Sequence, residues 1–130
     1  METLVISTDF GARQAYIAVA KSSEWETCAC VNCDEAIRLD RENRIDVLIM
    51  DAFAENGLCE LRRIRDSGVV APAIFISVGH VGVDEAGELG ICAVLSKPPD
   101  IAEMKRALVK AWDDRADMRI LVRFLESYGA

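Results

Sequence analysis

Short apolar runs recur along the chain, and segments with helical periodicity separate them. The runs cover residues 4–6, 25–31, 46–50, 73–77 and 91–95. Runs of four or five consecutive apolar residues are typical of strands buried on both faces, as in a parallel sheet. The run at 25–31 alternates apolar and polar positions instead, which also indicates a strand.

Helical spacing fills the intervals between these runs. Apolar residues three and four apart predict helices over 11–22, 34–43 and 56–66, and a short, weak one over 83–89. Asp34 is the expected N-cap of the second helix. Asp100, after two prolines and three residues before Glu103, predicts the start of the last helix. The apolar pattern of that helix stops at the polar patch "DDRAD" and resumes at five positions, namely Ile120, Leu121, Phe124, Leu125 and Tyr128.

The alternation of strands and helices predicts the fold class. A β-α-β-α order favours an α/β protein with a doubly wound, five-stranded parallel sheet, helices on both faces and right-handed connections. The resumed pattern at the end adds an extra C-terminal helical segment. A length of 130 residues suits one domain.

Net charge, the first residues and the cysteines indicate which kinds of partner and which cellular compartment suit this chain. The net charge of −7 argues against direct contact with nucleic acid and favours cations or basic protein surfaces. The first ten residues carry an acid at position 2 and a very short apolar run, so we expect no signal peptide. No apolar run approaches the ~20 residues that span a membrane. With five cysteines, an odd number, we expect a cytoplasmic protein with reduced thiols.

Polar residues follow the predicted strands, where the carboxyl ends of a parallel sheet meet and ligands bind. Asp9, Asp51, Ser77 and Lys97 each stand at or just beyond a strand end. Two nearby carboxylates repel each other, and Mg²⁺ relieves that repulsion. A carboxylate can attack phosphorus, and an ammonium group can neutralise the phosphoryl oxygens. The set therefore suits phosphoryl transfer.

This ordered set of acid, hydroxyl and Lys-Pro resembles the receiver domain of two-component response regulators, over residues 3 to about 114. The resemblance implies a flavodoxin-like sheet of strand order 2-1-3-4-5. It also implies that Asp51 is the phosphoacceptor, Ser77 the switch hydroxyl and Lys97 the phosphate-binding lysine. The Lys97-Pro98 peptide is typically cis in this family.

The resemblance further implies a metal site and a set of partners. Mg²⁺ would be held by Asp9, Asp51 and the backbone carbonyl of Phe53. From their positions near strand ends, Thr8 and His80 are candidate accessory residues; His80, three residues after Ser77, is either a base near the phosphoryl group or a solvated loop histidine. The domain would cover 1–114, and 115–130 would be a helical extension or connector. The partners would be a histidine kinase or phosphotransfer protein and a downstream output domain or protein. The amphipathic pattern of 115–128 itself suits a connector to an output domain, a helix that pairs with a second copy in a homodimer, or a helix that packs back on its own domain. No enzymatic activity is expected beyond self-phosphorylation and self-dephosphorylation.

Several positions depart from the family pattern. The family ends its first strand with two adjacent acids, whereas this chain has Ser7, Thr8 and Asp9, so at least one acid is missing. Fewer charged ligands weaken Mg²⁺ binding. The loop at 52–56 is about two residues shorter than usual. Val94 stands where the family has an aromatic switch residue.

Three other interpretations arise from the residues. A pseudo-receiver would keep the fold as an interaction or dimerisation module and lose the phosphorylation. Zinc binding at Cys28, Cys30 and Cys33 lacks the paired spacing and the fourth ligand of a zinc site. A flavin-binding, flavodoxin-like protein would need a phosphate loop after the first strand, where this chain carries Asp9.

Overall fold

The computed structural model describes residues 2–23, 25–51 and 57–129. Five parallel strands form one sheet in the order β2-β1-β3-β4-β5, as the resemblance predicted. The strands are β1 (Glu2–Ile6), β2 (Glu26–Cys30), β3 (Val47–Asp51), β4 (Ala73–Ile76) and β5 (Ile91–Leu95). The helices are α1 (Phe10–Ser22), α2 (Cys33–Glu42), α3 (Gly57–Asp66), α4 (Val83–Glu88) and α5 (Ile101–Gly129). The predicted fold class is confirmed.

The helices cover both faces of the sheet and divide the core in two. On one face α1 and α5 pack Tyr16, Met104 and Leu108 against the sheet. On the other face α2 and α3 pack Ile37 and Leu61, with α4 beside β5. Every residue of the central strand β3 is buried, which explains its continuous apolar run.

Helix α2 begins at a different cap from the one the sequence suggested. Asn32, not Asp34, is the N-cap, because its side chain accepts a 2.9 Å hydrogen bond from the Glu35 amide. The Glu35 carboxylate in turn accepts a 3.3 Å bond from the Val31 amide. Asp34 lies in the first turn and forms an exposed ion pair with Arg63 of α3. The expectation for Asp34 was wrong.

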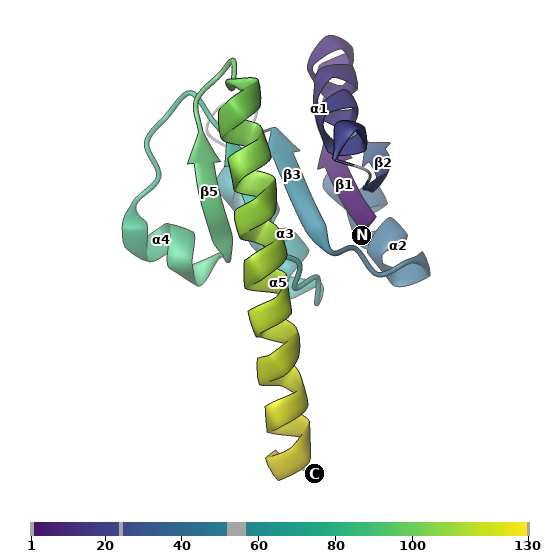
Figure 1. Ribbon diagram of the computed structural model, residues 1–130, viewed down its shortest axis with the longest axis vertical. Helices are drawn as coiled ribbons and strands as arrows, with labels where there is room; N and C mark the ends of the chain where they lie inside the picture. Colours follow the sequence, from purple (N-terminus) through teal and green to yellow (C-terminus); the bar gives the residue numbers. More distant parts are fainter. Residues whose placement is uncertain (1, 24, 52–56, 130) are drawn as a thin grey trace.

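Helix α5 is one uninterrupted helix of 29 residues. Its start matches the prediction, since Asp100 Oδ1 accepts a 3.2 Å hydrogen bond from the Ala102 amide. At 1.5 Å per residue the helix is about 44 Å long, and its second half extends past the sheet (Figure 1). The predicted division at residue 114 falls inside this helix and stays a prediction. Over the described part of the chain, no helix has the length and apolarity to cross a membrane.

Candidate functional site

Strand register places Ser7 opposite Asp51 at the carboxyl edge of the sheet. Ile6 of β1 pairs with Met50 of β3, so the residues that follow them are neighbours. Side chains alternate along a strand. Val5 and Ile49, two positions earlier, both belong to the core under α1 and α5. Ser7 and Asp51 therefore face the same side of the sheet.

Two groups hold the Asp51 carboxylate. Its side chain is 4% exposed, and Lys97 Nζ lies 2.5 Å from Oδ1. This contact is an ion pair without the alignment of a hydrogen bond. The Ser7 hydroxyl donates a buried 2.8 Å hydrogen bond to Oδ2. Each carboxylate oxygen thus has its own partner, which offsets the cost of burying the charge.

Ser7 is itself held from several directions, although the family resemblance gave it no role. It is 1% exposed, and its hydroxyl lies 2.8 Å from Asp51 Oδ2 and 3.3 Å from the Asp9 carbonyl oxygen, so its single proton goes to the nearer acceptor, Asp51. The same oxygen accepts a 3.2 Å bond from the Asp9 amide. The Ser7 carbonyl accepts a 2.8 Å bond from the Arg13 guanidinium, and its amide donates to the Cys30 carbonyl at 3.1 Å. The sequence marks Ser7 as a hydroxyl at a strand end, but its bond to Asp51 depends on the register of β1 against β3.

Asp9 begins helix α1. Its Oδ1 accepts a 2.9 Å hydrogen bond from the Ala12 amide, which is the normal contact of an N-cap. Both Asp9 and its neighbour Thr8 are exposed. The described contacts therefore assign Asp9 a structural bond at the helix start, outside the buried Ser7–Asp51 pair.

Tyr16 of α1 lies within the electrostatic influence of both acids. It is buried, and burial raises the pKa of its phenol to about 12, with the charges of Asp51 and Asp9 acting in the same direction. Tyr16 is therefore neutral at physiological pH. In the sequence, Tyr16 is one of the helically spaced apolar residues of the predicted helix over 11–22.

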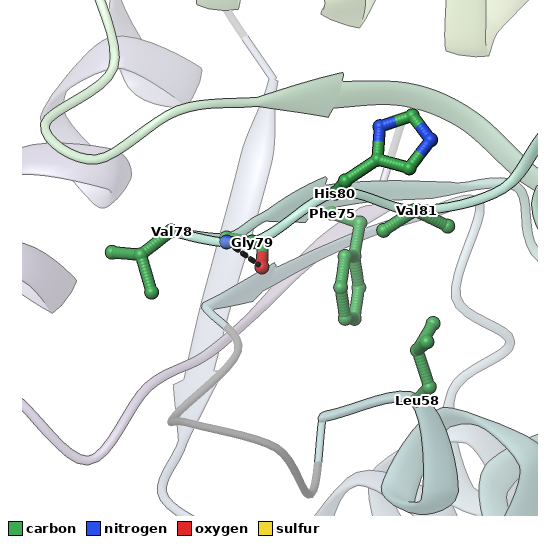
Figure 2. A pocket seen from close by; sticks show the side chains of 7 residues that line it. Leu58, Phe75, Val78, Gly79, His80 and Val81 are labelled. Atoms are coloured by element: carbon green, nitrogen blue, oxygen red, sulfur yellow. Dashed lines mark hydrogen bonds between the residues drawn. The ribbon is translucent and has the colours of Figure 1, made fainter.

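Ser77 lies at the next strand end but bonds within its own loop. Its hydroxyl accepts a 3.1 Å hydrogen bond from the Gly79 amide. Figure 2 shows this bond beside a cavity of about 380 Å³, which Phe75 and Leu58 also line. The His80 ring is exposed and points to the other side of the loop from Phe75 (Figure 2). Neither the hydroxyl nor the imidazole has a described bond to the Asp51 carboxylate, and Asp51 is not among the residues that line this cavity.

The described donor groups do not fit Mg²⁺. The ion takes about six oxygen ligands in near-ideal octahedral geometry, with one or two carboxylates among them. Here one buried carboxylate, Asp51, is already paired with the Lys97 ammonium. Among the described residues, no group of three or more His, Cys, Asp or Glu side chains could hold a metal ion. Phe53, the expected carbonyl ligand, lies outside the described residues. The Lys97-Pro98 peptide is cis, as the resemblance implied.

The thiols give no support to the zinc interpretation. All five cysteines are free. The thiols of Cys28, Cys30 and Cys33 each donate a weak hydrogen bond to a backbone carbonyl. Burial raises the pKa of the Cys30 thiol to about 12. Zinc binds the thiolate, and here Cys30 and Cys33 are core residues with Cys28 packed against them.

Comparison with known structures decides the fold. The receiver domain of the Francisella response regulator 1452 has a TM-score of 0.71 at 23% identity, over 85% of this chain and 95% of that one. The chemotaxis response regulator CheY4 of Vibrio cholerae has a TM-score of 0.69 at 17% identity, over 85% and 97%. This chain has the receiver fold. No family model and no curated protein matches the sequence.

The receiver fold of this chain also resembles part of a larger protein. NtrX from Brucella abortus has a TM-score of 0.78 at 18% identity and matches 99% of this chain. This chain spans only 30% of the NtrX chain. At sequence identities this low, the similarity shows a shared fold. That similarity covers nearly the whole of this chain.

Proposed function

We propose that this chain is a signalling module of the response-regulator type, and that Asp51 is its phosphoacceptor. The observation that carries the proposal is the 2.5 Å ion pair between Lys97 and Asp51 at the carboxyl edge of a receiver fold. In open α/β sheets ligands bind at this edge. A buried carboxylate with its own cation is a candidate for chemistry there.

The proposed reaction is a phosphoryl transfer from a phosphohistidine of a kinase or phosphotransfer protein. An Asp51 oxygen bonds to phosphorus, the P–N bond breaks, and the nitrogen of the donor keeps the electron pair. The Lys97 ammonium then pairs with the phosphoryl oxygens instead of Oδ1. The Ser77 hydroxyl leaves its bond with Gly79 and donates to a phosphoryl oxygen. No catalysis is proposed beyond self-phosphorylation and self-dephosphorylation.

The proposed output surface lies on α4, β5 and α5. None of the six residues of α4 is buried. Val94 of β5 is 43% exposed and Val109 of α5 is 60% exposed. Since Val94 has no ring to rotate, movement of the loop after Ser77 would carry the signal to α4. This surface would bind a downstream protein or output domain.

Intact-mass measurement tests the proposal. We expect the protein to gain one phosphoryl group from acetyl phosphate or phosphoramidate, and Asp51→Asn to gain none. Asp34→Asn is the matched control, because it makes the same change at an exposed acid of α2, away from the Asp51 pocket. A wild-type protein that stays unmodified, while another receiver domain is phosphorylated in the same buffer, contradicts the proposal.

A phosphorylation-independent interaction module is the second candidate. The observation that favours it is the Ser7–Asp51–Lys97 cluster, in which both carboxylate oxygens are already engaged. This candidate predicts that phosphodonors leave the amide NMR spectrum unchanged. It also predicts that Asp51→Asn retains the fold and the affinity for its partner protein.

A further inference from the structure

We infer that Ser7 takes the place of a metal-ligating acid, so that Lys97 and Ser7 hold Asp51 where a divalent cation would otherwise be needed. The identity of this one side chain then sets the affinity of the site for Mg²⁺. The inference deepens the proposed function, because it concerns the regulation of the same carboxylate. It departs from the metal site that the family resemblance implies.

The contacts of Asp51 leave little room for a cation. The Lys97 ammonium is 2.5 Å from Oδ1, and a divalent ion on that oxygen would meet a like charge at close range. The Ser7 hydroxyl directs its proton at Oδ2 from 2.8 Å. A hydroxyl that donates to the carboxylate supplies hydrogen-bond energy and no negative charge. With Asp9 engaged at the start of α1, the pocket has one buried acid and one ammonium.

The backbone at position 7 would direct an acidic side chain toward Asp51 if an aspartate replaced Ser7. It is fixed by the bonds from Arg13 to its carbonyl and from its amide to Cys30. Its Cβ faces Asp51 across the register of β1 and β3. An aspartate there would set a second carboxylate beside the first. The two charges would repel each other, and a divalent cation would relieve that repulsion.

Calorimetric titration with Mg²⁺ tests the inference, with thermal unfolding in EDTA and in Mg²⁺ as a second readout. We expect no saturable binding in the wild-type protein. We expect Ser7→Asp to bind Mg²⁺ at least about tenfold more tightly, to melt below wild type in EDTA, and to recover with Mg²⁺, because a ligand that binds only the folded state stabilises it. Ser7→Asn controls for size, and Ser67→Asp for charge at an exposed position outside the carboxyl edge. Neither control should gain Mg²⁺ binding.

Two results would overturn the inference. The first is saturable Mg²⁺ binding by the wild-type protein that Asp51→Asn removes. The second is a folded Ser7→Asp protein that binds Mg²⁺ no better than wild type. If Ser7→Asp does not fold with or without Mg²⁺, the wild-type titration decides alone, and absence of binding supports the inference.

Phosphorylation with and without EDTA separates this inference from the proposed function. If wild type accepts a phosphoryl group only with Mg²⁺, the inference fails and the proposed function stands. If wild type neither binds Mg²⁺ nor accepts a phosphoryl group, the proposed function fails and the inference stands.

Discussion

Arg115 Nε lies 2.6 Å from Asp46 Oδ1 and joins α5 to the chain just before β3. The two side chains are only 13% and 12% exposed. Asp46 Oδ2 also accepts a 2.9 Å bond from the Glu2 amide, and the Arg115 guanidinium lies 5.1 Å from the centre of the Trp112 ring. This cluster lies at the amino end of β3, opposite Asp51, where α5 leaves the sheet (Figure 1).

Replacement of Arg115 by Met should lower the free energy of unfolding by about 3 kcal/mol. Removal of one partner from a mostly buried ion pair leaves the other charge with poor compensation. Arg38→Met is the matched control, because its ion pair with Glu42 is more than half exposed on both sides. Exposed pairs contribute about 0–1 kcal/mol. Urea unfolding measures both variants, and equal losses would contradict the assigned role of Arg115.

A double-mutant cycle should reveal strong coupling between Lys97 and Asp51. Lys97→Met leaves the Asp51 carboxylate buried without its cation, and we expect a loss of about 2 to 3 kcal/mol. Asp51→Asn in the same background removes the uncompensated charge and should restore part of that stability. We therefore expect an interaction energy of about 1 to 3 kcal/mol. If the two losses simply add, the 2.5 Å contact does not stabilise the fold.

Much of the fold was predictable because it rests on local patterns. Continuous apolar runs identified the buried strands. Asp51, at the end of the third strand, pointed to the edge of the sheet that carries the candidate site. The cap of α2 was missed because two side chains compete for it. Asn32 bonds the Glu35 amide, and Glu35 bonds back to the Val31 amide, one residue before the cap; the choice of Asp34 overlooked this pair three residues apart.

The candidate site was only partly predictable because its contacts depend on register. The convergence of Asp51 and Lys97 at one edge was expected from their places at strand ends, and the resemblance gave Lys97 its role; their ion pair spans β4, which lies between β3 and β5. The bond from Ser7 requires that Ile6 align with Met50, which no local pattern specifies. The hydrogen-bond partner of the Ser77 hydroxyl depends on the path of the loop that follows it, because that path brings the Gly79 amide to 3.1 Å from the hydroxyl oxygen. The roles proposed for Asp9, Thr8 and His80 in phosphoryl chemistry stay predictions.

Stability should fall as the pH rises from about 10 to about 12, in part through Tyr16. Its pKa is raised to about 12 in the folded state, against about 10 in the unfolded chain. Between these values the unfolded chain has lost a proton that the folded protein keeps, so rising pH favours unfolding. Below pH 10 the contribution is fully present. Tyr16→Phe should have a flatter stability profile over this window, as measured by urea unfolding at several pH values. An unchanged slope would contradict the assignment.

Cys59 should react with a thiol reagent well before the other four cysteines. It is the exposed cysteine, whereas Cys30, Cys33 and Cys92 are buried and Cys28 is partly buried. Burial raises the pKa of Cys92 to about 11, so only about a thousandth of it is thiolate at pH 8. We expect one fast phase with Ellman's reagent, absent in Cys59→Ser. A fast phase of more than one equivalent would contradict the described burial.

Removal of the distal half of α5 should leave the sheet domain intact. A chain that ends at Ala116 keeps Arg115 on Asp46, and it keeps the buried Ala111 and Leu108. Because the removed part extends past the sheet (Figure 1), we expect a change of no more than about 1 kcal/mol in the free energy of unfolding.

A chain that ends at Lys110 is the contrast, because it loses both Ala111, which is fully buried, and the Arg115 ion pair. It should be destabilised by more than about 3 kcal/mol. Urea unfolding at several protein concentrations measures both chains. If the 130-residue chain alone gains stability with concentration, its distal helix pairs with a second copy. Equal, large losses in both truncated chains would mean that the distal half is part of the folding unit.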